Sequence, residues 1–124
     1  MEPFIIDIKK LTLDNIFYRR VIHTTKDSQL VIMSLRPGEE ISGEIHDGTQ
    51  FIRVEAGQGE VTLDNLIYQL KDDIAVNIPG GVWHYVRAIG PDDLKIYIIY
   101  SPPVHPLDSI EYIDPETKQH RRIN

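Results

Sequence analysis

The chain has 124 residues, of which 41% are hydrophobic and 26% are charged. This is the composition of one ordinary globular domain, and it excludes a disordered or fibrous protein. The absence of cysteine excludes a disulfide framework, a thiolate metal site and a cysteine nucleophile. The formal net charge is −6. Because non-specific nucleic-acid binding needs a basic surface, we expect no nucleic-acid partner.

The N-terminal segment predicts neither a secretory signal nor a membrane anchor. Residues 1–7 lack a basic start and a long apolar run. Apolar runs such as residues 96–100 are far too short to cross a bilayer. We therefore expect a cytoplasmic protein with no membrane partner. The basic residues His120, Arg121 and Arg122 are interpreted as a solvated tail.

Short β-branched runs separated by turn residues occupy the middle of the chain. Each run is followed closely by Gly, Pro, Asp or Asn, and the runs cover residues 30–35, 50–55, 60–63, 66–70, 74–78 and 94–100. Strands of this length with turns at this spacing predict an all-β sandwich or barrel. Residues 8–17 fit either a short helix or a strand, and both remain open. From Val104 onward we expect loop, with a weak strand or turn at residues 110–113.

Four polar side chains form the candidate site. Glu44 and His46 are two residues apart, so on a strand they point to the same face. Gln50 has the same parity and faces inward if the strand resumes after residues 47–49. His84 follows the turn at residues 79–81. Two imidazoles and a carboxylate are a common ligand set for Fe, Mn, Ni or Zn, although each residue alone also fits a packed histidine or an exposed strand edge.

The spacing of these residues resembles the two motifs of the cupin family. The first motif is Gly, five residues, H-x-H, three or four residues, Glu, six residues and Gly. Here the corresponding positions hold Gly38, Glu44, His46, Gln50 and Gly57. The second motif is Gly, five residues, P-x-G, two residues, His, three residues and Asn. Here the corresponding positions hold Asp73, Pro79, Gly81, His84 and Ala88.

The resemblance implies a cupin-type double-stranded β-helix, which is a jelly-roll barrel, with little helix. Residues 1–124 would be a single domain, with a barrel core at about 30–100 and a C-terminal extension at 101–124. Carried over position by position, Glu44, His46, Gln50 and His84 would hold one divalent metal ion, Fe, Mn, Ni or Zn. The exchange of one imidazole for an amide oxygen weakens the preference for Cu and Zn relative to Fe, Mn and Ni.

A smaller resemblance is to single-domain cupins loosely described as mannose-6-phosphate-isomerase-like. Residues 37–41 read P-G-E-E-I, residues 44–46 read E-I-H and residues 50–51 read Q-F. Residues 100–105 read Y-S-P-P-V-H. This resemblance implies that Glu44 and Gln50 are the pattern of a subgroup and not the decay of a site.

Two functions follow from the resemblance. One is a metal-dependent enzyme, an isomerase or a dioxygenase, acting on a sugar-like or other small metabolite. The alternative is a non-catalytic module that binds a carbohydrate or metabolite, because the fold alone does not decide function. We lean toward an enzyme, assign no catalytic residue, and expect a small-molecule ligand as partner. The resemblance also allows a homodimer.

The remaining polar and aromatic residues have structural interpretations. Either Tyr97 or Tyr100 could reach the cavity, and because their parity is opposite the sequence does not choose between them. The preferred interpretation of each is a core tyrosine with a satisfied hydroxyl. Trp83 is expected to pack at the barrel mouth. Tyr18, Arg19 and Arg20 could donate hydrogen bonds to an anionic ligand. Residues of this kind on a first strand are more often edge or dimer contacts, and we prefer that interpretation. Surface positions are expected of His23, His105 and His120.

Overall fold

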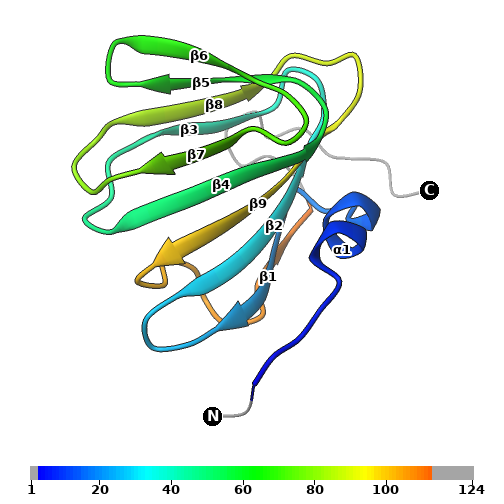
Figure 1. Ribbon diagram of the computed structural model, residues 1–124, viewed down its shortest axis with the longest axis vertical. Coiled ribbons are helices and arrows are strands. Elements are labelled where there is room, and N and C mark those ends of the chain that lie inside the picture. Colours follow the sequence, from blue (N-terminus) through cyan, green and yellow to red (C-terminus); the bar gives the residue numbers. More distant parts are fainter. Residues whose placement is uncertain (1–2, 113–124) are drawn as a thin grey trace.

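Two antiparallel β-sheets and one short helix make up the fold (Figure 1). The computed structural model describes residues 3–112. The larger sheet contains β1 (Arg19–Thr24), β2 (Gln29–Leu35), β4 (Thr49–Ala56), β7 (Ala75–Ile78), β9 (Leu94–Ser101) and β10 (Ile110–Glu111). The smaller sheet contains β3 (Glu40–Glu44), β5 (Gly59–Leu63), β6 (Leu66–Leu70) and β8 (His84–Ala88). Their orders are β10-β1-β2-β9-β4-β7 and β3-β8-β5-β6.

The predicted all-β architecture is confirmed. Strands β2, β4, β5, β6, β7 and β9 match the six β-branched runs to within one residue at each end. The segment left open between helix and strand is helical, as α1 (Ile8–Asp14). Asp7 caps this helix because its side chain accepts a hydrogen bond from the backbone N–H of Lys10 at 3.1 Å. The helix contacts β2, β4 and β9 of the larger sheet.

Strand β9 lies at the centre of the larger sheet and sets the core. Its inward residues Leu94, Ile96 and Ile98 are fully buried, and they alternate with more exposed residues on the other face. Ile98 pairs with Val31 of β2 on one side and with Ile52 of β4 on the other, so the three side chains form a continuous apolar row.

At one end of the same strands, the inward positions change from apolar to polar. Gln29 of β2, Tyr100 of β9 and Gln50 of β4 are paired across the three strands and are all buried. Buried polar groups need hydrogen-bond partners, so this row marks an end of the barrel that is built for polar contacts. The candidate ligands lie at this end.

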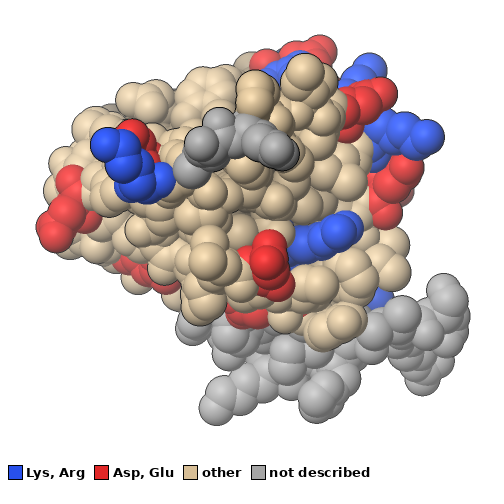
Figure 2. Space-filling model, turned by 90° about the horizontal axis from the view of Figure 1, so that it is seen from below, with Lys and Arg blue, Asp and Glu red and all other residues tan. Residues whose placement is uncertain are grey.

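Charges of both signs are interspersed on the face of the molecule that Figure 2 shows, and that face carries no continuous basic patch. Among residues 3–112, no helix is long and apolar enough to span a bilayer. The predicted basic tail at His120, Arg121 and Arg122 lies outside the described residues.

Two neighbouring isoleucines of β9 provide a matched test of this core. Ile98→Ala removes a side chain that is 0% exposed, and we expect the free energy of unfolding to fall by about 2–5 kcal/mol. Ile99→Ala on the opposite face, where the side chain is 36% exposed, should cost less than about 1 kcal/mol. Urea unfolding of both variants measures the difference. Equal losses would mean that the inward face of β9 is assigned wrongly.

Candidate metal centre

An irregularity in β3 turns Glu44 toward the interior. Ile41 pairs with Val86 and Glu44 pairs with His84, so two residues of β3 stand opposite one residue of β8. This is a β-bulge. Residues three apart in a regular strand face opposite ways, and the bulge instead brings Ile41 and Glu44 to the same side. Glu44 thereby lies directly across from His84.

The turn at residues 79–81 is fastened to the segment that carries His46. The backbone N–H of Gly81 donates to the carbonyl of His46 at 2.9 Å. Gly80 packs so tightly that a Cβ atom on it would lie 2.1 Å from the carbonyl oxygen of Asp47. Gly81 has a φ of +86°, in the left-handed region that favours glycine. The turn therefore sets the start of β8, and with it His84, beside His46.

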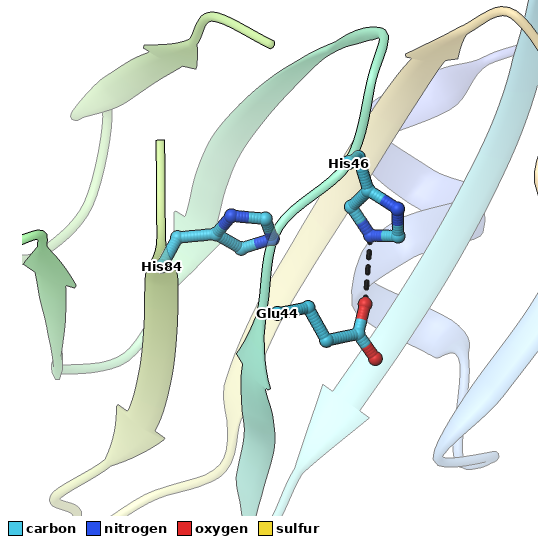
Figure 3. Close-up of side chains that lie close together, drawn as sticks. All are labelled: Glu44, His46 and His84. Atoms are coloured by element: carbon cyan, nitrogen blue, oxygen red, sulfur yellow. Dashed lines mark ion pairs between the residues drawn. The ribbon is translucent and has the colours of Figure 1, made fainter. Parts of the chain in front are cut away.

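Three side chains meet at this place (Figure 3). One carboxylate oxygen of Glu44 and one ring nitrogen each of His46 and His84 all lie within 4.8 Å of one another. His46 Nε2 is 2.7 Å from Glu44 Oε2, and the two histidine rings are 5.3 Å apart between centroids. We call these three residues the ligand cluster. The structure thus brings together three of the four predicted ligands.

The fourth predicted ligand, Gln50, contacts His84. The two Nε2 atoms are 2.7 Å apart, and both residues are buried. On its other side, His84 Nδ1 lies 3.0 Å from the carbonyl oxygen of Val82. A carbonyl only accepts, so Nδ1 carries the proton and Nε2 keeps its lone pair. In this arrangement the amide of Gln50 donates to that lone pair, so a metal ion bound at Nε2 would take the place of this hydrogen bond. The role of Gln50 as a ligand stays a prediction.

The donor set fits a divalent metal ion. Two donors about 2.1 Å from a metal at a right angle lie roughly 3 Å apart. The observed 2.7 Å between His46 Nε2 and Glu44 Oε2 is close to that separation. The bond from His84 Nδ1 to Val82 is the kind of contact that orients a metal-binding imidazole and leaves Nε2 as the ligand atom. The ligand cluster could therefore hold a metal ion, with Gln50 at its edge.

Two aromatic rings continue the wall of the site beyond His46. The centroid of the Tyr100 ring is 6.1 Å from that of His46 and 5.1 Å from that of His105. His105 is half-buried, so its expected surface position is wrong. Its Nε2 is shielded from solvent and has no hydrogen-bond partner among residues 3–112. Strand periodicity gave no signal here, because His105 follows the last strong strand in a proline-rich loop.

Arg19 also lies inside, and its preferred interpretation as an edge or dimer contact is wrong. The residue is 8% exposed, and Nη1 donates to Glu111 Oε1 at 2.6 Å. Its Nε is shielded and has no partner in the described part of the chain. A buried polar atom left unpaired costs about 1–3 kcal/mol. Tyr18 is buried as well, and its hydroxyl donates to the carbonyl of Glu40 at 2.6 Å.

The buried groups near Arg19 have shifted pKa values. Burial raises the pKa of Tyr100 to about 12, although the positive charge of Arg19 opposes the shift. Burial lowers the pKa of His105 to about 4, and the charge of Arg19 adds to this effect. At neutral pH, Tyr100 is therefore a protonated phenol and His105 a neutral imidazole.

Other sequence predictions have mixed outcomes. Tyr100 is the inward tyrosine of β9, whereas Tyr97 lies on the other face. Trp83 packs against Gly43 and stacks with Tyr85, and it is 37% exposed. His23 is half-buried and stacks on Phe4, with ring centroids 4.2 Å apart, so its surface interpretation is wrong. His120 lies outside the described residues.

The chain belongs to the cupin family, since the family model described as "Cupin domain" matches residues 31–100. It is 40% identical over 116 residues to the uncharacterized protein YrkC of Bacillus subtilis (strain 168), covering 88% of this chain and 62% of that protein. It is also 40% identical over 121 residues to the uncharacterized protein L612 of Acanthamoeba polyphaga mimivirus, covering 94% and 76%. The chain thus spans less than two thirds of YrkC.

A solved structure supports the fold in detail. BH2720 from Bacillus halodurans is 38% identical with a TM-score of 0.87, and the match covers 90% of this chain and 89% of that one. The predicted cupin-type barrel is therefore confirmed. A more distant relative is the 5-nitrosalicylic acid 1,2-dioxygenase of Bradyrhizobium sp., which is 27% identical over 66 residues, or 53% of this chain and 32% of that enzyme.

The turn that positions His84 can be tested with two glycines. In Gly80→Ala, the new Cβ would overlap the carbonyl of Asp47, so we expect the turn to move and metal retention to fall. Gly38→Ala is the control: it meets no atom within 4 Å but is strained by a φ of +88°. It should lose stability and keep its metal. Elemental analysis and thermal unfolding separate these effects, and equal metal loss in both variants would contradict the role of the turn.

The lowered pKa of His105 predicts a loss of stability in mild acid. The unfolded chain takes up this proton near the ordinary value of 6.5, whereas the folded protein does so only near 4. Between these values the unfolded state binds more protons, so stability falls as the pH falls. His105→Gln should remove that part of the pH dependence in thermal unfolding. An NMR titration in which the His105 ring protonates near its ordinary pKa would refute the prediction.

Proposed function

We propose that this cupin is a metal-dependent enzyme acting on a small, oxygen-rich metabolite, with Glu44, His46 and His84 as metal ligands and Gln50 as their fourth partner. The observation that carries the proposal is the convergence of the three ligand atoms within 4.8 Å of one another. They lie at the polar end of an otherwise apolar barrel, where a small molecule meets both a shielded site and hydrogen-bonding groups.

The donor set favours a dioxygenase. Two imidazoles and one carboxylate are the protein ligands typical of non-haem Fe(II) oxygenases. A divalent metal ion held there would supply Lewis-acid polarisation and, as Fe(II), open positions for dioxygen and substrate. This choice is supported by the similarity, over 66 residues, to a protein named as a dioxygenase. Isomerisation of a sugar-like substrate is the second reaction that the same ligands allow.

The chain's own residues orient and shield this site. The carbonyl of Val82 fixes the ring of His84 so that Nε2 points to the ligand cluster. Glu44 supplies the single negative charge of the set. Tyr100 remains protonated at neutral pH, because burial raises its pKa to about 12, and it can donate a hydrogen bond to a substrate oxygen.

Metal content gives the first test of the proposal. Protein purified without chelator should contain close to one Fe, Mn, Ni or Zn per chain, and His46→Ala and His84→Ala should retain none. Gln50→Ala should weaken binding less than Glu44→Ala, because it removes a neutral group; we expect a loss of about 10- to 100-fold for a supporting contact. His23→Ala is the control, since that ring stacks on Phe4 and should not affect the metal.

Contrary results have clear meanings. A parent protein that takes up no metal even after reloading would overturn the proposal. If metal binds, the Fe(II)-loaded protein is mixed with oxygen and its absorption is followed. An absorption change with oxygen consumption supports a dioxygenase, and substrate turnover without oxygen supports an isomerase. A metabolite that raises the melting temperature without turnover would instead support a non-catalytic binding module.

A further inference from the structure

A buried glutamine holds the backbone of His105 in a fixed position. Gln29 is 1% exposed, and its Nε2 donates to Thr24 Oγ1 and to the carbonyl of His105, both at 2.9 Å. Its Oε1 accepts from the backbone N–H groups of Val104 at 3.2 Å and His105 at 2.9 Å. The amide thus satisfies the backbone N–H and carbonyl groups of this loop, as a neighbouring strand would, and it holds His105 in a fixed position.

His105 belongs to a group of polar side chains next to the ligand cluster. Tyr100 lies between the two, with its ring centroid 6.1 Å from that of His46 and 5.1 Å from that of His105. Arg19 is buried on the same inward face of the larger sheet: it pairs with Met33 of β2, which pairs with Ile96 of β9, the strand that carries Tyr100. Consistent with this placement, its positive charge acts on the pKa values of both Tyr100 and His105. We call Arg19, Tyr100 and His105 the polar corner.

Two atoms of the polar corner lack the partners that buried polar atoms normally have. Arg19 Nε and His105 Nε2 are both shielded from solvent, and neither makes a hydrogen bond within residues 3–112. Arg19 as a whole is 92% buried, from its exposed fraction of 8%. Nearly all buried polar groups in folded proteins are satisfied, so two unsatisfied nitrogens in one corner call for a ligand or water that supplies the missing contacts.

The donors of the corner favour a group that accepts hydrogen bonds. A guanidinium only donates, and the phenol of Tyr100 can also donate. The nearby carboxylate of Glu111 already accepts from Arg19 at 2.6 Å, so it offers little to another donor. This pairing also leaves too little positive charge for a phosphate dianion. A single carboxylate offers acceptor oxygens to these donors, gains charge-assisted hydrogen bonds from the guanidinium, and adds only one negative charge.

We propose that Arg19, Tyr100 and His105 form a carboxylate-binding subsite, so that the small molecule recognised by this cupin is a carboxylic acid. As a statement about the substrate, this rests on the proposed function, whereas carboxylate binding at the corner does not require a metal. One end of the molecule would lie at the ligand cluster and its carboxylate at the corner. Because both nitrogens are shielded, the side chain of His105 or Tyr100 has to rotate before the carboxylate can reach them.

Acetate is the probe, and acetamide is its neutral counterpart of the same shape. Each is titrated into the Zn²⁺-treated protein while the NMR signals of the His105 and Tyr100 rings are followed. These signals are assigned with His105→Gln and Tyr100→Phe. We expect acetate to shift both rings with saturation and acetamide to leave them unchanged. Arg19→Gln should weaken the acetate effect at least about tenfold, because a charge-assisted hydrogen bond is lost.

The variants distinguish the possible sites of binding. If acetate acts equally on the parent and on Arg19→Gln, but not on His46→Ala, the carboxylate binds at the metal and the proposed subsite is wrong. If acetate and acetamide act alike, or neither acts, carboxylate recognition at the corner is also wrong. Tyr100→Phe, which keeps the ring, serves where Arg19→Gln fails to fold, and it should weaken acetate binding while acetamide still has no effect.

Metal content separates this proposal from the proposed function. Arg19→Gln should bind as much metal as the parent, because Arg19 is not a member of the ligand cluster. A parent without metal whose His105 signal still responds to acetate through Arg19 would keep the subsite and overturn the metal-dependent function. A parent protein that contains metal but shows no response to acetate at His105 would keep the metal-dependent function and overturn the subsite.

Discussion

The contact between the turn at residues 79–81 and the backbone at His46 and Asp47 is the constraint on which the site depends. One hydrogen bond joins Gly81 to His46, and Gly80 packs against the next carbonyl with no room for a side chain. His46 lies in a loop, where nothing in a strand ladder fixes its position. The turn fixes its position instead, through the hydrogen bond from Gly81. The same turn leads into β8, so one contact sets the distance between the two histidines.

Around this contact the barrel is divided into an apolar body and a polar end. The apolar row through Val31, Ile98 and Ile52 provides the burial that stabilises the sheets. Two residues further along the same strands, the row through Gln29, Tyr100 and Gln50 is polar and equally buried. The strand register that aligns the core therefore also aligns the walls of the site. A metal ion at this end would be shielded on the side of His84 and Gln50, which are buried, and accessible on the side of Glu44, which is partly exposed.

Much of this arrangement could be predicted from the sequence, because it depends on local pattern. Strand lengths followed from β-branched runs and turn residues, and the spacing of Glu44, His46 and His84 followed the cupin motifs. Even the replacement of a motif glycine by Asp73 keeps the backbone form, since Asp73 has a φ of +71°. Asp is one of the few residues besides glycine that adopts this region readily.

The features that sequence reasoning missed depend on contacts between distant residues. The bulge in β3 is visible only in its pairing with β8. The inward tyrosine of β9 could not be chosen because Ile98 and Ile99 place apolar side chains on both faces. Arg19 resembles a surface residue until Glu111, 92 positions later, pairs with it. His105 resembles a loop histidine until Gln29, 76 positions earlier, holds its backbone.

These missed residues share a physical property that sets them apart from the core. Arg19 and His105 each have a buried nitrogen with no partner in the part of the chain that the structure describes, which makes the fold less stable than an apolar corner would. The rest of the structure nevertheless holds them firmly, through Glu111 in one case and Gln29 in the other. Rigid support for an unfavourable arrangement is typical of binding sites, where the ligand supplies the missing partner. The proposed carboxylate subsite would explain both unpaired nitrogens, because its ligand would supply the partners that the fold leaves out.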